Sequence, residues 1–288
     1  MKKMRVKTAA KINLALDIVG KLPNGYHEIE SVFQTVGLYD EITVELTEGD
    51  ISISCEVPEK FLSSDLIPCD ERNIAHRAAK KFIDENKLEI GCRIQIKKGI
   101  PSQAGMGGGS TDAAAVLFCL NKLTGKSFST PEKLGADVPF FLIGGTAHVT
   151  GIGEKITPIS DYSGKILVIA KGTQGVSTAE AYNKIDALEN PAPIPVKDLI
   201  SAIQNSENTA PYVGNIFESV IKLDEVDDIK SKMLNLGADA ACMTGSGSAV
   251  FGIFNNMKSA EKCVEILCKS GYFSEVCETV QESFIILE

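Results

Sequence analysis

The glycine-rich stretch IPSQAGMGGGSTDAAAVLFCLNKL, residues 100–123, constrains the fold more than any other segment. Glycines followed by Ser-Thr-Asp and an alanine-rich apolar run predict a loop that leads into a helix, expected here from Ala113 to Leu123. The unpaired N–H groups and the dipole at a helix N-terminus favour an anion. The stretch therefore predicts a loop and a helix that together bind a phosphate.

The loop matches neither of the two common nucleotide-binding motifs. Only three residues separate Gly105 from Gly109, and a serine follows where G-x-x-x-x-G-K-[ST] requires lysine. The motif G-x-G-x-x-G also fails, because Ser110 stands where the third glycine belongs. Ser110 and Thr111 are candidate helix caps that can offer hydroxyls to phosphate or magnesium. For Asp112 we favour stabilisation of the helix dipole in the first turn over binding of a metal.

A triphosphate at this loop needs positive charge from elsewhere in the chain. A helix N-terminus offers about half a positive charge, so magnesium and at least one basic side chain must supply the rest. The candidates are Lys11, which stands between alanine and isoleucine, and the pair Lys97 and Lys98 just before the loop. The net charge of −9 and a pI near 5.0 argue against nucleic acid or an anionic membrane as a partner.

Hydrophobic periodicity indicates strands and helices in both halves of the 288-residue chain. A chain of this length, 44% of it hydrophobic, has material for two domains, which we expect at residues 1–160 and 161–288. Strands are predicted within residues 5–20, 40–46, 50–57, 93–98, 140–156, 165–172 and 238–254. Helices are predicted at residues 70–87, 113–123 and 258–271, and in much of the segment after Ser177.

Cysteine usage and apolar segments bear on the cellular compartment. The eight cysteines form no C-x-x-C pair and have no clustered histidines beside them, so we expect reduced, mostly buried thiols in a cytoplasmic protein. Residues 1–20 resemble a secretory signal, but Lys11, Asn13 and Asp17 interrupt the apolar region that such a signal needs. No run of 18 apolar residues occurs, so no membrane span is expected.

Three further stretches contain residues that could contribute to a catalytic or binding site. Asp137 lies in the apolar sequence LGADVPFFLIGG, where a carboxylate serves either as a turn residue or as a buried group kept for chemistry. The sequence MTGSGSAVFG, residues 243–252, predicts a tight turn that either lies near a ligand or simply joins two strands. The sequence LPNGYHE, residues 22–28, carries the Asn-Gly signal of a surface hairpin.

The motifs IPSQAGMGGGSTDAAA, GADVPFF and TGSGSAVFG, in this order, resemble those of the GHMP superfamily of small-molecule kinases. The stretches AAKINLALDIVGKLPNGYHEIESVFQTVGLYDEI and GVSTAEAY resemble the member of that superfamily that acts on diphosphocytidyl methylerythritol. The resemblance runs from about residue 6 to 284 and implies an α/β (α+β) fold of two domains separated by a cleft. The N-terminal domain is then ribosomal-protein-S5-like and the C-terminal domain ferredoxin-like.

The same resemblance implies an activity and a donor site. ATP, with Mg²⁺, would donate its γ-phosphoryl group to the 2-hydroxyl of the erythritol unit, in the non-mevalonate route to isoprenoids. Asp137 is the expected catalytic aspartate, which accepts or orients the hydroxyl proton, and Lys11 is its partner lysine. Backbone amides of the loop replace the missing lysine. The residues expected at ATP are Asn73, near the adenine, and Lys97, Pro101, Gly105, Gly107, Gly108, Gly109, Ser110 and Thr111.

The resemblance also implies how the acceptor is held. Tyr26 and Tyr182 would enclose the cytosine between them, and His27 would read its hydrogen-bonding edge. Thr178 lies four residues before Tyr182, and Asn13 is expected beside the catalytic pair. The expected partners are the acceptor and ATP, with no nucleic acid and no membrane, in a monomer or weak homodimer.

The sequence departs from the family pattern in one segment, and two other functions are weighed against the expected one. The family commonly has a longer helical segment before LGADVPFF, whereas this sequence leaves about one turn between Ser129 and Gly135. A kinase for mevalonate, homoserine or a sugar is one rival, against which the Tyr-His pair and GVSTAEAY argue. A nucleotide-binding sensor without catalysis is the other, against which the retention of Lys11 and Asp137 argues.

Overall fold

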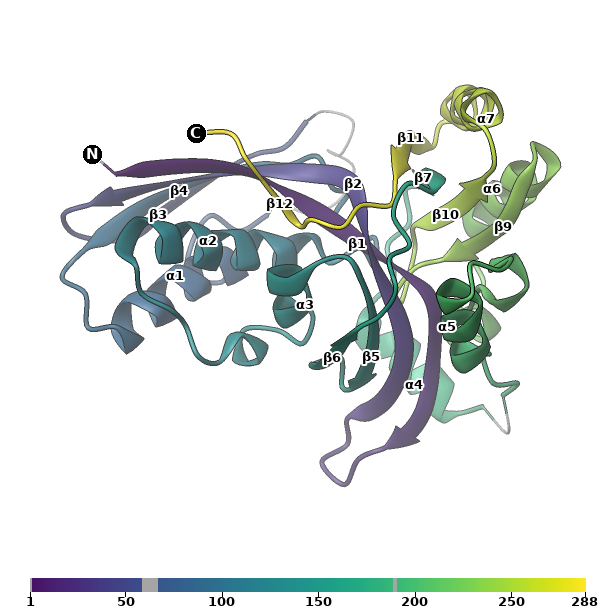
Figure 1. Cartoon of the computed structure of the whole chain (residues 1–288), viewed down its shortest axis with the longest axis horizontal. Helices are drawn as coiled ribbons and strands as arrows, with labels where there is room; N and C mark the ends of the chain where they lie inside the picture. The colour runs from purple at the N-terminus through teal and green to yellow at the C-terminus, as the bar shows by residue number, and fades with distance from the viewer. Residues whose placement is uncertain (1, 59–66, 189–190) are drawn as a thin grey trace.

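A computed structural model describes residues 2–58, 67–188 and 191–288, and it contains two β-sheets with helices packed on them (Figure 1). The first sheet has eight strands, five of them in the order β12-β1-β2-β4-β3, while β5 pairs with β2, β6 with β5 and β8 with β1. Its strands are β1 (Lys3–Lys21), β2 (His27–Thr47), β3 (Ser52–Glu56), β4 (Gly91–Lys97), β5 (Thr146–Gly151), β6 (Lys155–Pro158), β8 (Gly214–Asn215) and β12 (Phe284–Ile286).

β1 and β2 form one long antiparallel ribbon that runs through the middle of the first sheet and reaches the helix α4 (Thr178–Asp186) (Figure 1). Three shifts of register along the ribbon, the last between Ile18 and Gly20, are positions where the two strands bend together. At the far tip Gly25 takes a positive φ of 87°, as a tight Asn-Gly turn requires. The hairpin predicted at residues 22–28 is therefore confirmed.

Three helices cover one face of the first sheet: α1 (Ile74–Glu85), α2 (Gly108–Thr124) and α3 (Val138–Ile143) (Figure 1). α2 is enclosed almost completely, and its small residues Ala113 to Ala115 are fully buried against neighbouring elements. Two predictions here are wrong. α2 begins five residues before the predicted start at Ala113, and α3 occupies the first part of residues 140–156, which were expected to be strands. The run VPFFLI is too short for periodicity to separate a helix from a strand.

The second sheet is antiparallel, with the strand order β11-β7-β10-β9. Its strands are β7 (Ile166–Lys171), β9 (Ala238–Met243), β10 (Val250–Phe254) and β11 (Phe273–Glu278), and its helices are α4, α5 (Val196–Gln204), α6 (Asp224–Asn235) and α7 (Met257–Lys269). The chain order strand, helices, strand, strand, helix, strand is the ferredoxin-like arrangement. The strands predicted within 165–172 and 238–254 and the helix predicted at 258–271 are confirmed.

The two sheets are joined by chain crossings and by a shared core. β8 and β12, both late in the sequence, pair with β1 of the first sheet. One apolar cluster contains Ile12 and Ile100 from the first part of the chain together with Leu167 and Phe251 from the second. The elements that meet at this junction are therefore held firmly against one another. The division at residue 160 stays a prediction.

The prediction of buried thiols is confirmed for five of the eight cysteines. All eight are free, and five are buried, whereas Cys69 and Cys268 are exposed and Cys55 is half-buried. In the part of the chain that the structure describes, no helix has both the length and the apolar character that a membrane crossing requires.

Candidate active site

The glycine-rich loop is built from backbone that only glycine allows. Gly105 and Gly107 have positive φ values of 70° and 73°. A Cβ atom on Gly105 would lie 2.1 Å from the carbonyl oxygen of Thr244, and one on Gly107 would lie 2.6 Å from the ring of Phe141. The loop is thus fixed between the turn after β9 and the helix α3, and its free N–H groups at the start of α2 border a hollow of about 450 Å³. We call this the loop hollow.

Substitution of Gly105 by alanine tests how tightly the loop is held. We expect Gly105→Ala to lower the free energy of unfolding by about 3 kcal/mol, because the methyl group adds a clash to an unfavourable φ. Gly164 is the matched control, since it has a similar φ of 77° and nothing within 4 Å of its Cβ position. Gly164→Ala should cost only about 1 kcal/mol. Equal losses in urea unfolding of the two variants would contradict a tightly packed loop.

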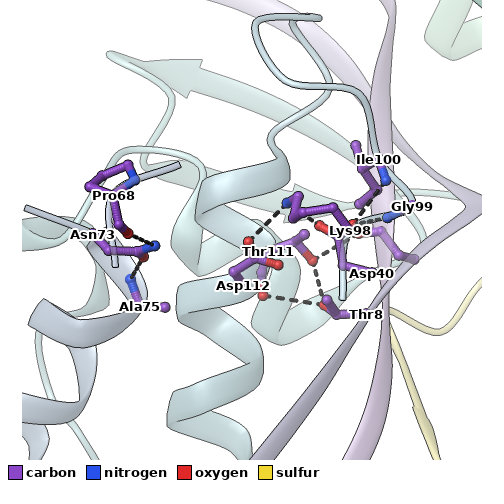
Figure 2. Close-up of polar contacts among 11 residues, drawn as sticks. Thr8, Asp40, Pro68, Asn73, Ala75, Lys98, Gly99, Ile100, Thr111 and Asp112 are labelled. Carbon is purple, nitrogen blue, oxygen red and sulfur yellow. Dashed lines mark hydrogen bonds and ion pairs between the residues drawn. The ribbon is translucent and has the colours of Figure 1, made fainter. Parts of the chain in front are cut away.

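Neither hydroxyl predicted to cap α2 does so. The N-cap position is Gly107, so Ser110 and Thr111 lie inside the first turn. Thr111 is fully buried, and its Oγ1 donates to the carbonyl oxygen of Ala9 at 2.8 Å and forms a hydrogen bond with the hydroxyl of Thr8 (Figure 2). Thr111 therefore ties α2 to β1 by its side chain, and of the two residues only Ser110 lines the loop hollow.

The lysine that reaches the loop hollow is Lys98, whereas Lys97 does not reach it. Successive residues of a strand point to opposite faces, and Lys97 ends β4 on the exposed face, where it is in register with Glu41. Lys97 borders a different hollow on that side of the sheet. The expectation that Lys97 meets the nucleotide is therefore not supported by its position, and the sequence KK alone carries no signal that separates the two neighbours.

Lys98 is enclosed between two carboxylates (Figure 2). Its Nζ donates to Asp40, and to Asp112 Oδ2 at 2.9 Å, while Asp40 Oδ1 accepts from the backbone N–H groups of Gly99 at 2.6 Å and Ile100 at 2.8 Å. The side chains of Lys98 and Asp112 are each 5% exposed and that of Asp40 is fully buried. Burial disfavours the ammonium, but the two carboxylates outweigh it and raise the pKa of Lys98.

Asp112 has a different role from the one predicted. No acidic residue lies in the first turn of α2, so Asp112 does not stabilise the helix dipole there. It pairs with Lys98 instead. Burial, together with the nearby carboxylate of Asp40, raises the pKa of Asp112 well above its usual value against the opposing effect of Lys98. Its second oxygen, Oδ1, is buried with no hydrogen-bond partner among the described residues.

Asn73 closes the opposite side of the loop hollow. Its Oδ1 accepts from the N–H of Ala75 at 2.9 Å and its Nδ2 donates to the carbonyl of Pro68 at 2.8 Å, so it caps α1 (Figure 2). α1 was predicted to begin at Asp70 with acidic residues in its first turn, but the helix starts at Ile74 because Asn73 caps it. Asn73 and Pro101 both line the hollow.

Lys11 and Asp137 come from elements far apart in the sequence and face each other. Lys11 Nζ lies 3.7 Å from Asp137 Oδ2 and donates to Asn13 Oδ1 at 2.8 Å. It also lies 4.6 Å from the centre of the Phe33 ring, within cation–π range. Burial lowers the pKa of Lys11, and the charge of Asp137 opposes that effect.

Asn13 is fixed by partners on both sides. Its Nδ2 donates to the hydroxyl of Ser31 at 3.0 Å, and its Oδ1 accepts from the N–H of Gly245 at 3.0 Å. The turn at residues 244–249 therefore orients Asn13, and through it Lys11. Of the two interpretations of MTGSGSAVFG, the structure favours a turn that contributes to the site.

The carboxylate of Asp137 is not used to cap the helix that follows it. Asp137 precedes α3, its side chain makes no capping hydrogen bond, and 29% of that side chain is exposed. It borders a second hollow of about 190 Å³, the central hollow, which Lys11, Asn13, Gly105 and Gly107 also line. Because both glycines line the loop hollow too, the glycine-rich loop lies where the two hollows meet. The segment before Asp137 contains a single 3-10 turn, Pro131–Lys133, as its shortness predicted.

A third hollow of about 700 Å³ opens at the hairpin tip and shares Asp137, Thr178 and Tyr182 with the central hollow. We call it the hairpin hollow. The ring of His27 stacks on that of Tyr182 with centres 4.6 Å apart, and Thr178 Oγ1 is hydrogen-bonded to Ser246 Oγ at 2.9 Å. Burial raises the pKa of Tyr182 to about 12. Tyr26 also lines this hollow but is 59% exposed, and the ring that stacks on Tyr182 is that of His27.

The residues predicted at the acceptor thus meet in two adjoining hollows, and those predicted at ATP, except Lys97 and Thr111, meet in the loop hollow. Sequence reasoning missed Asp186 and Lys21, which line the hairpin hollow. The only signal for Asp186 is its position one helical turn after Tyr182 on α4. Among the described residues, no group of three or more His, Cys, Asp or Glu side chains is placed to hold a metal ion.

Comparison with known proteins supports one family over most of the chain. The family models described as GHMP kinases N terminal domain and GHMP kinases C terminal match residues 73–145 and 185–272. A 4-diphosphocytidyl-2-C-methyl-D-erythritol kinase of Clostridium perfringens is 41% identical over 284 residues, which cover 95% of this chain and 96% of the relative. One of Clostridium beijerinckii is 39% identical over 276 residues, which cover 92% of this chain and 96% of the relative.

Solved structures give the same picture. A crystal structure of 4-(cytidine 5'-diphospho)-2C-methyl-D-erythritol kinase has a TM-score of 0.80 and 29% identity, covering 96% of this chain and 99% of the other. A homoserine kinase from Cytophaga hutchinsonii has a TM-score of 0.72 at 16% identity, covering 100% of this chain and 98% of the other, and shows the shared fold alone.

Proposed function

Because the chain belongs to the 4-diphosphocytidyl-2-C-methyl-D-erythritol kinases within the GHMP kinases, we propose how its three hollows share the reaction of that family. The protein is an ATP-dependent kinase with an alcohol acceptor. ATP binds in the loop hollow, the reacting hydroxyl and the γ-phosphoryl group meet in the central hollow, and the cytidine end of the acceptor lies in the hairpin hollow. The hydroxyl is the 2-hydroxyl of the erythritol unit, and the product serves the non-mevalonate route to isoprenoids.

The donor half relies on backbone N–H groups and one enclosed lysine. The residues that begin α2 and carry its unpaired N–H groups line the loop hollow. The Lys98 ammonium has a third donor beyond those used by Asp40 and Asp112. These groups hold the phosphates, while Asn73 and Pro101 border the adenine. Lys98 thereby supplies the cation that this loop lacks in its own sequence.

Magnesium fits this half of the site. Asp112 and Ser110 both line the loop hollow, and Asp112 Oδ1 is buried without a hydrogen-bond partner among the described residues. A carboxylate oxygen and a hydroxyl are oxygen ligands of the kind that magnesium prefers. These two residues would hold an ion that enters with ATP, whereas the hydroxyl of Thr111 is engaged by Ala9 and Thr8. When bound, the ion would neutralise negative charge on the transferring phosphoryl group.

The acceptor half uses the Lys11–Asp137 pair. Asp137 accepts or orients the proton of the attacking hydroxyl, because its carboxylate is free of capping duty and faces the hollow beside the phosphate loop. Lys11, whose Nζ lies 3.7 Å from Asp137 Oδ2, pairs with that carboxylate and stabilises negative charge on the nucleophile. This facing pair at the meeting point of the hollows is the observation that carries the proposal, and it also argues against a catalytically inactive sensor.

Turnover measurements test the assignment against its rivals. We expect ADP release with magnesium-ATP and 4-diphosphocytidyl-2-C-methyl-D-erythritol, and none above background with mevalonate or homoserine. Turnover of mevalonate or homoserine alone would overturn the acceptor assignment. Nucleotide binding without turnover of any acceptor would favour the sensor.

A further inference from the structure

A cluster of three side chains joins the tip of the β1–β2 hairpin to the end of α4. Asp186, the last residue of α4, lies with Oδ1 2.6 Å from His27 Nε2, and its Oδ2 accepts from Lys21 Nζ at 2.6 Å. All three residues line the hairpin hollow. The side chain of His27 is 10% exposed and its ring is held flat against Tyr182, so its edge has little freedom to turn.

The contact with Asp186 determines which nitrogen of His27 carries the proton. A carboxylate can only accept hydrogen bonds, and those from Lys21 and His27 lower the pKa of Asp186, which keeps it ionised. Nε2 must then carry hydrogen, and in a neutral imidazole Nδ1 is left as a lone-pair acceptor. No hydrogen-bond partner for Nδ1 lies among the described residues, so this acceptor is available to a ligand.

We propose that Asp186 is a positioning residue that holds His27 in the Nε2–H tautomer and thereby makes the hairpin hollow selective for a pyrimidine with an exocyclic amino group. The inference rests on the proposed function, which assigns this hollow to the cytidine end of the acceptor. The amino group at C4 of cytosine donates to a lone pair, whereas the carbonyl at C4 of uracil presents a second acceptor to it. Asp186 acts through His27 and need not contact the base.

The variant Asp186→Asn is expected to exchange the hydrogen-bond donor and acceptor of the His27 ring. The ammonium of Lys21 only donates, so it takes the single oxygen of the new amide, and the amide NH₂ then faces His27 Nε2. Nε2 must accept, which moves the ring proton to Nδ1. We expect KM for the cytidine acceptor to rise about 10–100-fold. We expect kcat to change less than about threefold, because the Lys11–Asp137 pair is untouched.

One spectroscopic and one binding measurement distinguish a role of Asp186 in setting the tautomer of His27 from a merely structural role. The chain has three histidines, so ¹⁵N spectra of the imidazole rings can identify the tautomer of His27 in the whole enzyme. Calorimetric titration with CDP and UDP should show a preference for CDP in the parent and in Asp186→Glu, which keeps the carboxylate, and loss of that preference in Asp186→Asn. Asp84→Asn is the matched control, since Asp84 forms an exposed 2.7 Å pair with Lys80 at the end of α1.

The outcomes are distinguishable. An Nδ1–H tautomer in the parent, or an unchanged CDP preference in Asp186→Asn, overturns the role of Asp186 and leaves the kinase assignment intact. A parent enzyme that binds neither nucleotide and does not turn over the cytidine acceptor overturns the assignment of the hairpin hollow, and this inference with it. Equal loss of affinity for CDP and UDP in Asp186→Asn would mean that Asp186 only holds the hairpin to α4, and this result also contradicts the proposal.

Discussion

Replacement of Asp137 by asparagine is expected to lower kcat by about 10²–10⁴-fold while ATP binds nearly as well as before. The amide preserves the size of the side chain but cannot accept the hydroxyl proton. It also leaves Lys11 buried without its carboxylate, so the pKa of Lys11 should fall further, because burial already lowers it and Asp137 opposes that effect. The proposed phosphate loop offers backbone N–H groups, which this substitution does not alter, so its affinity for ATP should be unchanged. Single-turnover kinetics and ATP titration measure the two effects separately.

A mutant cycle with Lys11 provides the control for this prediction. Lys11 and Asp137 face each other at 3.7 Å, and we propose that they act as a unit. The double variant Lys11→Met/Asp137→Asn should then be little slower than the slower single variant. Independent losses that multiply would mean that the two side chains serve separate steps. Turnover of Asp137→Asn within about threefold of the parent would show that another group handles the proton.

The glycine-rich loop and the carboxylate of Asp137 could be predicted from sequence because the signals for them are local. At Gly105 and Gly107 the backbone has a positive φ and packs closely against neighbouring atoms. Only glycine tolerates both conditions, so the residue type itself signals such a loop. The carboxylate of Asp137 in an apolar run is similarly conspicuous. The family resemblance then brought Lys11 to Asp137, which no local pattern does across 126 residues of chain.

The features that sequence missed depend on which face of an element a side chain takes. Lys97 and Lys98 are identical neighbours, and only the pairing of β4 decides which of them is buried under the loop. The sequence places Asp112 in the first turn of the helix. Because α2 in fact begins at Gly108, Asp112 lies beyond the first turn, where it pairs with Lys98. Asp186 meets His27 only because the long hairpin bends against α4. Tertiary packing sets all three.

Substitution of Lys98 by methionine is expected to lower the free energy of unfolding by about 3–5 kcal/mol. Methionine matches the length and apolar stem of lysine, so packing is largely kept and the loss comes from charge. Asp40 and Asp112 would remain buried without the ammonium that lies between them. Lys97→Met is the matched control, because the neighbouring side chain is exposed on the other face of β4, and its effect should lie within about 0.5 kcal/mol. Urea unfolding of the two variants measures the difference.

The pH dependence of that difference identifies its cause. Without Lys98, nothing opposes the burial and the Asp40 carboxylate that already raise the pKa of Asp112 in the folded chain. A carboxyl group whose pKa is higher in the folded than in the unfolded state binds its proton more tightly when folded. Its destabilising effect is therefore absent at pH below the usual carboxyl pKa, and it grows as pH rises towards the folded value. The deficit of Lys98→Met should then be larger at pH 8 than at pH 5, and Lys98→Met/Asp112→Asn should recover part of it at pH 8. A deficit that is the same at both pH values would trace the loss to packing and remove the electrostatic role assigned to Lys98.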